Sequence, residues 1–156
     1  MIEIYCDGAS SKNGTNDAIG GWAYIIKSAD EEQVYFWDSG FAPKATNQQM
    51  EITAALKAIQ KATGNFTSIL IGTEELVIYS DSAYVVNCFN QDWWKKWERN
   101  GWINSSKKPV ANRELWEKLI REYKRIPFCT FAKVKGHDGN YYNEMVDQLA
   151  VSARLG

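Results

Sequence analysis

Four acidic residues have the type and surroundings of a catalytic cluster: Asp7, Glu51, Asp81 and Asp147. Asp7 ends an alternating run and Asp81 follows the apolar run 76–80, whereas Glu51 and Asp147 lie in stretches whose apolar residues have helical spacing. A carboxylate in such surroundings is costly to bury without a partner. If the fold brings the four together, divalent metal bound through oxygen ligands would relieve their repulsion. Such a metal site is suited to phosphoryl transfer.

The neighbours of these acids strengthen the hypothesis, because a single Asp is more typical of a turn or a helix cap. Small residues at 8–10 follow Asp7 and would let the backbone approach a ligand. Thr46 and Asn47 precede Glu51 at a predicted helix start, where free N–H groups can bind phosphate. Ser82, after Asp81, is expected to cap the next helix.

An aromatic and basic segment covers residues 93–102, with four Trp and three Lys or Arg in ten residues. Trp93 and Trp97 are four residues apart and share a helix face, which Lys96 and Arg99 can flank. Packing into the core is the alternative, and we expect it for at least one of the tryptophans. Aromatic platforms beside cations are typical of nucleic-acid binding, which we favour over a plain solvated face.

His137 is the only histidine, and it lies between Gly136 and Gly139, ten residues before Asp147. A lone histidine is more often a surface or hydrogen-bonded residue than a catalyst. Its ordinary pKa range nevertheless suits proton transfer near neutral pH. Both interpretations remain open on these grounds.

The elements that must position these residues alternate in a way that predicts an α/β fold with a mixed sheet. Five strands are predicted at 1–7, 20–27, 33–41, 76–80 and 128–135. Helices are predicted at 48–62, from Ser82 to near Phe89, at 112–125 and at 143–154, and Thr46 or Asn47 caps the first of them. Ile52, Leu56, Ile59 and Thr63 form the buried face of that first helix.

Composition restricts the classes of protein to consider. The 156 residues, 45% apolar and 24% charged, are typical of one soluble globular domain over 1–156. No apolar run approaches the roughly 20 residues of a membrane span, and a strand at the first residue leaves no room for a signal peptide. Three cysteines without metal-binding spacing predict free thiols in a reducing compartment, by default the cytoplasm.

The net charge of −1 is unevenly distributed. Residues 93–125 hold ten Lys or Arg against four Glu, a net +6, so the rest of the chain carries −7. This division predicts an acidic, metal-attracting site beside a basic surface that could contact a polyanion.

Six segments, in order, carry a resemblance over essentially the whole chain: Tyr5-Cys6-Asp7-Gly8-Ala9-Ser10, Thr46-Asn47-Gln48-Gln49-Met50-Glu51, Tyr79-Ser80-Asp81-Ser82-Ala83-Tyr84-Val85, Trp93 with Trp97 and Gly101-Trp102, Lys107-Lys108-Pro109-Val110-Ala111-Asn112, and Val134-Lys135-Gly136-His137 followed by Asn143-Glu144 and Asp147-Gln148-Leu149-Ala150. Together they resemble ribonuclease H of type 1. The resemblance implies a ribonuclease H-like fold, a five-stranded mixed β-sheet flanked by α-helices. It also implies an endoribonuclease that cleaves the RNA strand of RNA–DNA hybrids and leaves 5′-phosphate and 3′-hydroxyl ends.

The same resemblance assigns roles to individual residues. Asp7, Glu51, Asp81 and Asp147 match the metal-binding carboxylates, which would hold two Mg²⁺, with Mn²⁺ as a substitute. His137 matches a histidine that assists proton transfer or product release.

The substrate, an RNA–DNA hybrid, would be recognised through its minor groove. Asn13 and Gln48 match positions that sense RNA 2′-hydroxyls, and Asn47 matches a minor-groove contact. Trp93 and Trp97 would lie against deoxyribose. Lys44, Thr46 and Asn112 match a DNA-phosphate site, and Lys96 belongs to a basic protrusion that adds salt-dependent affinity.

The sequence also departs from the family pattern, and Ala83 stands where a polar groove-contacting residue is often found. The connection 64–75 is longer than usual, and Glu98 places a negative charge inside the protrusion. Nothing in the sequence requires more than a monomer. Two alternatives remain: a DNA nuclease or integrase-like relative with the same fold, and an inactive module that binds hybrids.

Overall fold

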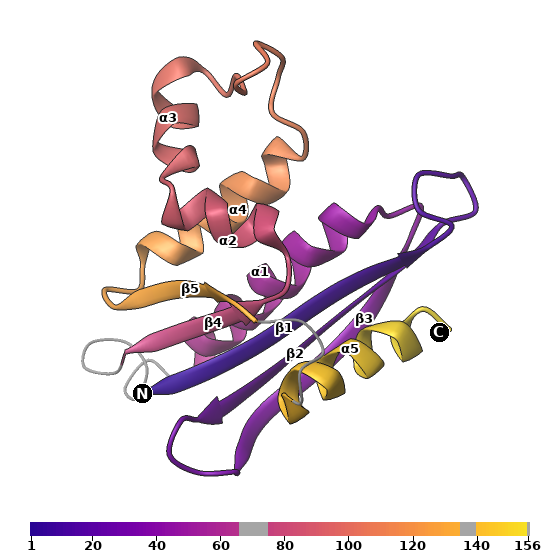
Figure 1. The fold of residues 1–156 in the computed structure, drawn as a ribbon, viewed down its shortest axis with the longest axis vertical. Coiled ribbons are helices and arrows are strands. Elements are labelled where there is room, and N and C mark those ends of the chain that lie inside the picture. The colour runs from indigo at the N-terminus through magenta and orange to yellow at the C-terminus, as the bar shows by residue number, and fades with distance from the viewer. Residues whose placement is uncertain (66–74, 135–139, 156) are drawn as a thin grey trace.

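The computed structural model describes residues 1–65, 75–134 and 140–155, and Figure 1 shows their arrangement. The elements in chain order are β1 (Ile2–Ser11), β2 (Ile19–Ser28), β3 (Val34–Pro43), α1 (Asn47–Asn65), β4 (Leu76–Ser80), α2 (Ala83–Asn90), α3 (Trp93–Asn100), α4 (Arg113–Lys124), β5 (Cys129–Lys133) and α5 (Tyr141–Ala153). His137 and most of the long connection 64–75 lie outside the described residues.

The five strands form one mixed sheet in the order β3-β2-β1-β4-β5. The first three make an antiparallel meander, and β4 and β5 join it in parallel with β1. Parallel neighbours need crossover connections, and α1 supplies the first of them, between β3 and β4. The predicted five-stranded mixed sheet is confirmed.

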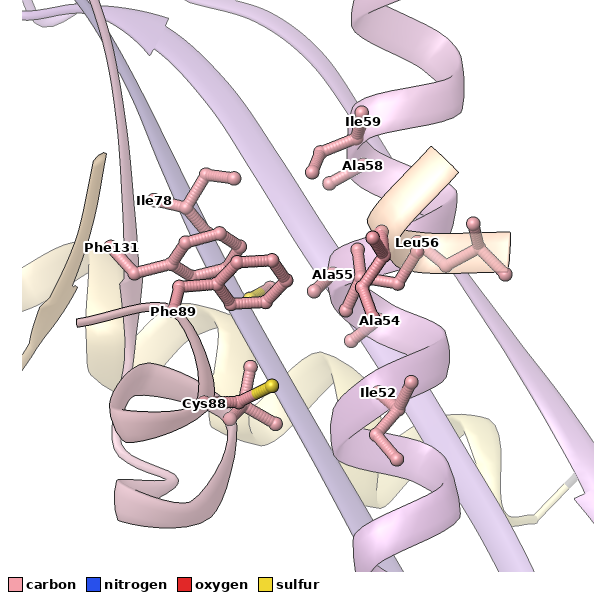
Figure 2. Close-up of a cluster of buried hydrophobic side chains, with 14 of the residues drawn as sticks. Ile52, Ala54, Ala55, Leu56, Ala58, Ile59, Ile78, Cys88, Phe89 and Phe131 are labelled. Carbon is pink, nitrogen blue, oxygen red and sulfur yellow. The ribbon is translucent and has the colours of Figure 1, made fainter. Parts of the chain in front are cut away.

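Helices cover both faces of this sheet, with α5 alone on one face (Figure 1). The larger core joins α1, α2 and α4 to the other face. Ile52, Leu56, Ile59 and Thr63 of α1 are buried, as their spacing predicts. Figure 2 shows Ala55, Ala58 and Ile59 of α1 facing side chains of β4 and α2. Phe89 and Phe131 stack here with their ring centroids 4.1 Å apart.

One strand boundary differs from the prediction in a way that matters for the site. β1 was expected to end at Asp7, but it runs on to Ser11, because β2 pairs with it as far as Ser11 opposite Ile19. The residues that continue the strand are small, so hydrophobic alternation could not reveal them. Asp7 therefore lies inside a strand and not in a turn.

Caps and termini follow the local sequence. Thr46 Oγ1 accepts from the N–H of Gln49, and Gln49 Oε1 accepts from the N–H of Thr46, which is a capping box at the start of α1. Ser82 caps α2 by accepting from the N–H of Val85, as expected. The remaining elements differ by up to three residues at either end from their predicted bounds, and Trp93–Asn100 forms a separate helix, α3.

Three of the four tryptophans in the segment 93–102 pack into the core: Trp94, Trp97 and Trp102. The core alternative is thus correct for more of them than expected. Glu98 accepts from Lys124 Nζ of α4 at 2.8 Å, so a cation compensates the negative charge that it adds to this segment.

Cys6, Cys88 and Cys129 are all free, as predicted. Among the described residues, no helix is long and apolar enough to cross a membrane.

Candidate active site

Three of the four acids meet at the centre of the sheet. One carboxylate oxygen from each of Asp7, Glu51 and Asp81 lies within 4.8 Å of the others. They come from β1, α1 and the turn after β4, respectively. These three residues are far apart in the sequence. The prediction that their carboxylates would converge is confirmed.

The acidic cluster lies where β4 ends and leaves the rest of β1 without a neighbour on that side. β4 pairs with β1 only as far as Tyr79 opposite Tyr5, so β1 continues beyond its parallel neighbour. Asp81 lies directly after β4, beside the part of β1 that β4 does not pair with. A crevice at the carboxyl ends of parallel strands is the usual place for a ligand in an α/β sheet.

Gly8 allows α1 to approach this edge. A Cβ atom at Gly8 would overlap the backbone carbonyl group of Met50 and the backbone nitrogen of Glu51. The small residue was expected to let a ligand approach, but it is a helix that comes close. The approach places Glu51 beside Asp7.

Backbone and hydroxyl groups fix the carboxylate of Glu51. The N–H of Gly8 donates to Glu51 Oε1 at 3.1 Å and to Asp7 Oδ1 at 2.8 Å. Ser80 Oγ donates to Glu51 Oε2 at 3.4 Å, and it accepts from the N–H of Ser82 at 3.1 Å. Ser80 is fully buried. Neither Gly8 nor Ser80 was predicted to hold a carboxylate. A backbone N–H and a serine at a strand end carry no signal in the sequence that marks this role.

The fourth acid, Asp147, approaches from the opposite face of the sheet. Its helix, α5, packs on β2 so closely that a Cβ at Gly21 would overlap the carbonyl oxygen of Ala150. Asp147 interacts with the side chain of Asp7, and this hydrogen bonding contributes to the raised pKa of Asp7. Asp147 is not part of the group of carboxylate oxygens within 4.8 Å of one another.

Burial and like charge disfavour ionisation at the centre of the cluster. Burial, then the charge of Glu51 and hydrogen bonding with it, raises the pKa of Asp7 to about 10. Burial also raises the pKa of Glu51 to about 7, although hydrogen bonds from Asp7, Gly8 and Ser80 oppose the shift. Among the described residues, no Lys or Arg forms an ion pair with Asp7, Glu51 or Asp81. These carboxylates would therefore gain strongly from a bound cation.

A groove of about 500 Å³ lies over α2, α3 and the loop that follows α3. Trp93, Lys96 and Trp97 line it, so the structure brings together three residues that were predicted to bind substrate. Trp93 is half-buried, whereas Trp97 exposes only 6% of its surface. Their ring centroids are 6.3 Å apart.

Tyr84 also lines this groove, and sequence reasoning missed it. Its ring lies 5.8 Å from that of Trp93 and 5.4 Å from that of Trp116. Burial among these rings raises the pKa of the tyrosine hydroxyl. The available signal was its place in the segment 79–85, three residues after Asp81.

The start of α1 joins three segments. Asn47 Oδ1 accepts from the N–H of Ser10 at 2.6 Å, and Asn13 Oδ1 accepts from the N–H of Asn47 at 3.0 Å. Asn13 and Asn47 are thus brought together, and both are exposed beside the exposed Gln48. This is the surface that was predicted to contact RNA.

Lys44 and Asn112, which were predicted to hold phosphate, both have left-handed backbone, with φ values of 58° and 60°. Lys44 is exposed, and its N–H donates to the carbonyl oxygen of Ala18. Asn112 precedes α4, and its Oδ1 accepts from Gln49 Nε2 at 3.2 Å. Because Gln49 also closes the capping box on Thr46, Thr46 and Asn112 are joined through one side chain.

Known proteins resemble this chain along its length. The family model for RNase H matches residues 1–154. A ribonuclease H of Chlorobaculum parvum is 40% identical over 149 residues, which cover 96% of this chain and 92% of that protein. The crystal structure of LC9-RNase H1, a type 1 RNase H with the type 2 active-site motif, superposes with a TM-score of 0.77 at 25% identity, covering 99% of this chain and 72% of the other. LC11-RNase H1 in complex with RNA/DNA hybrid has the same fold, with a TM-score of 0.71 at 18% identity over 98% of this chain and 99% of the other.

The family match over residues 1–154 includes every described helix and strand and all four acids of the candidate site. The chain therefore belongs to the RNase H family of metal-dependent nucleases, whose members cleave the RNA strand of RNA–DNA hybrids.

Proposed function

We propose that this protein is an endoribonuclease that hydrolyses the RNA strand of RNA–DNA hybrids at the cluster of Asp7, Glu51 and Asp81, with Asp147 as a fourth ligand, and leaves 5′-phosphate and 3′-hydroxyl ends. The observation that carries the proposal is the convergence of three carboxylates within 4.8 Å. Among the described residues, no Lys or Arg pairs with them. Membership in the RNase H family supports the choice of substrate.

The cluster fits Mg²⁺, and we propose two ions, with Mn²⁺ as a substitute. Magnesium prefers hard oxygen ligands, and the described donors at the site are carboxylate oxygens without a Cys or His among them. When bound, such ions would activate a water molecule and neutralise charge on the scissile phosphate. Asp7 interacts with both Glu51 and Asp147, so it is the carboxylate best suited to serve two ions.

The surrounding residues hold these ligands in a fixed arrangement. Gly8 and Ser80 donate to the two oxygens of Glu51, which fixes the plane of its carboxylate. Asp81 is held by the turn in which Ser82 begins α2. His137 remains a proposed participant in proton transfer or product release, on the family resemblance alone.

Substrate would lie across the groove and the start of α1. We propose that Trp93 and Trp97 contact deoxyribose, with Lys96 beside the DNA backbone. Lys44, Thr46 and Asn112 would bind a DNA phosphate, because Lys44 is an exposed cation and Thr46 and Asn112 lie at helix N-termini. Asn13 and Gln48 would contact the RNA 2′-hydroxyls, and Asn47 would make a minor-groove contact.

We further propose that residues 1–156 act as a single catalytic domain and a monomer in the cytoplasm. Three free thiols suit a reducing compartment. The integrase-like and inactive alternatives are less well supported, because the groove carries the aromatic residues expected for a hybrid and the carboxylates Asp7, Glu51 and Asp81 meet.

The test is cleavage of an end-labelled RNA–DNA hybrid with Mg²⁺ and with EDTA, beside double-stranded RNA, double-stranded DNA and single-stranded RNA. We expect metal-dependent cutting of the RNA strand of the hybrid only. Cutting of DNA would favour the nuclease relatives. Tight hybrid binding without cutting would favour the inactive module.

A further inference from the structure

Gln49 is the only side chain in the described structure that joins the N-termini of α1 and α4 by hydrogen bonds to both. Its Oε1 accepts from the N–H of Thr46 at 2.9 Å, and its Nε2 donates to Asn112 Oδ1 at 3.2 Å, across 63 positions of sequence. The Asn112 side chain makes no capping bond to its own helix, so its carbonyl oxygen is available to Gln49.

These contacts fix the orientation of two amides. A backbone N–H can only donate, so the atom of Gln49 that faces Thr46 must be the carbonyl oxygen. Its NH₂ group therefore faces Asn112, and the atom of Asn112 that it meets must be an acceptor. As a result, the NH₂ group of Asn112 points away from Gln49 and is available to donate to another group.

The capping box does the same for the hydroxyl of Thr46. Thr46 Oγ1 accepts from the N–H of Gln49 at 3.1 Å, which occupies a lone pair and leaves the hydroxyl hydrogen free to donate. One glutamine thus directs donors on two helix N-termini outward, beside the exposed Lys44. Such a set of donors suits an anion with several oxygens.

We propose that Gln49 is a positioning residue that orients Thr46 and Asn112 as donors toward one phosphate of the DNA strand. The inference rests on the proposed function, because it assigns Gln49 to the phosphate site suggested above. Gln49 acts through its neighbours and does not touch the substrate. Without its NH₂ group, the amide of Asn112 can turn and present its oxygen to the phosphate.

The Gln49→Glu variant tests the proposal. Glutamate still accepts from the N–H of Thr46, so the capping box and the melting temperature should be kept, but it cannot donate to Asn112. We expect KM for the hybrid to rise about five- to tenfold, with kcat within about twofold, because the lost interaction concerns a charged group away from the chemistry. Gln60→Glu is the matched control, since it makes the same charge change on an exposed position of α1 and should leave KM unchanged.

A double-mutant cycle separates orientation from charge. In the Asn112→Ala background, Gln49→Glu should change KM by less than about twofold, because the group that Gln49 orients is gone. Effects that multiply would overturn the proposal. So would an unchanged KM in Gln49→Glu alone, or an equal rise in Gln60→Glu.

A phosphate scan locates the contact. Hybrids that each carry one neutral methylphosphonate in the DNA strand should show one position at which wild-type KM rises, and Gln49→Glu should lose this sensitivity. Undiminished sensitivity in the variant, or no sensitive position in the wild type, would overturn the proposal. Failure of the proposed function is distinguishable, because the wild type would then not cleave the unmodified hybrid.

Discussion

The backbone N–H of Gly8 donates to Glu51 Oε1 at 3.1 Å, although 43 positions separate the two residues. The same N–H donates to the carboxylate of Asp7. One backbone group thus sets the distance between two carboxylates from different elements. This contact exists only because α1 and β1 approach more closely than any side chain at position 8 would allow.

Gly8→Ala should therefore damage both the fold and the site. The added methyl group would overlap the backbone of Met50, which cannot yield as a flexible side chain could. We expect a loss of at least about 2 kcal/mol in the free energy of unfolding and a large loss of cleavage. Chemical denaturation and single-turnover kinetics measure the two effects. Gly64→Ala is the control, because a Cβ there meets no atom within 4 Å and should be neutral or slightly stabilising. Equal stability of the two variants would contradict this account of the contact.

Ser80→Ala should weaken metal binding more than folding. The change removes the hydroxyl that donates to Glu51 Oε2 and leaves the buried backbone of β4 in place. Groups that orient metal ligands are typically worth about 10- to 100-fold in affinity or activity. We expect the Mg²⁺ concentration for half-maximal activity to rise about tenfold, which a metal titration of the cleavage rate measures. An unchanged titration curve would show that Ser80 does not position Glu51.

The stability of the metal-free protein should fall as pH rises. Folding raises the pKa of Asp7 to about 10 and that of Glu51 to about 7, above the unfolded values of about 4. The folded state therefore holds more protons than the unfolded state between these values. This contribution to stability is complete below about pH 4 and is lost as pH rises through 7 and beyond.

Thermal unfolding in EDTA between pH 5 and pH 9 measures this effect. We expect the melting temperature to fall over that range, and Mg²⁺ to restore it by mass action. Asp7→Asn should melt roughly 5 °C higher than the wild type in EDTA at pH 9, because a neutral amide need not take up a proton on folding as the buried Asp7 must. A wild-type melting temperature that rises steadily to pH 9 in EDTA would refute the argument.

Lys96 should contribute more to substrate binding than its neighbour Lys95. Lys96 lines the groove beside Trp93. Lys95 Nζ instead lies 3.5 Å from Asp92 Oδ1 and over the ring of Trp94. We expect Lys96→Ala to raise KM about three- to fivefold and to lower the slope of log affinity against log salt by about one. Lys95→Ala is the charge-matched control and should have less than half that effect. Equal effects would mean that net charge, and not the groove, binds the hybrid.

Much of the fold follows from local patterns in the sequence. β4 was predicted with its observed bounds, because Leu76–Ser80 is a short apolar run with turn residues after it. The buried face of α1 follows from the spacing of Ile52, Leu56 and Ile59. The extension of β1 to Ser11 was not predicted, because pairing with β2, and not hydrophobicity, holds those small polar residues in the strand.

The acidic residues of the candidate site could be predicted from the sequence, but several of the residues that position them or line the groove could not. Carboxylates in apolar surroundings are conspicuous in a sequence, and Asp7, Glu51 and Asp81 do meet. Ser80, Tyr84 and Gln49 are ordinary residues whose roles depend on contacts between distant elements. Trp97 was expected to lie against deoxyribose, and it is mostly buried because α3 packs against α2 and α4.

The most direct test of the account is single-turnover cleavage of the hybrid by wild type and by Asp81→Asn, at enzyme concentrations that saturate binding. The substitution keeps the size of the side chain but removes one of three converging charges. The account predicts that Asp81→Asn binds the hybrid within about threefold of wild type, because Asp81 is not among the residues proposed to bind the substrate. Its cleavage rate should fall by at least about 10³-fold. Cleavage by Asp81→Asn at the wild-type rate would contradict the assignment of this cluster as the active site.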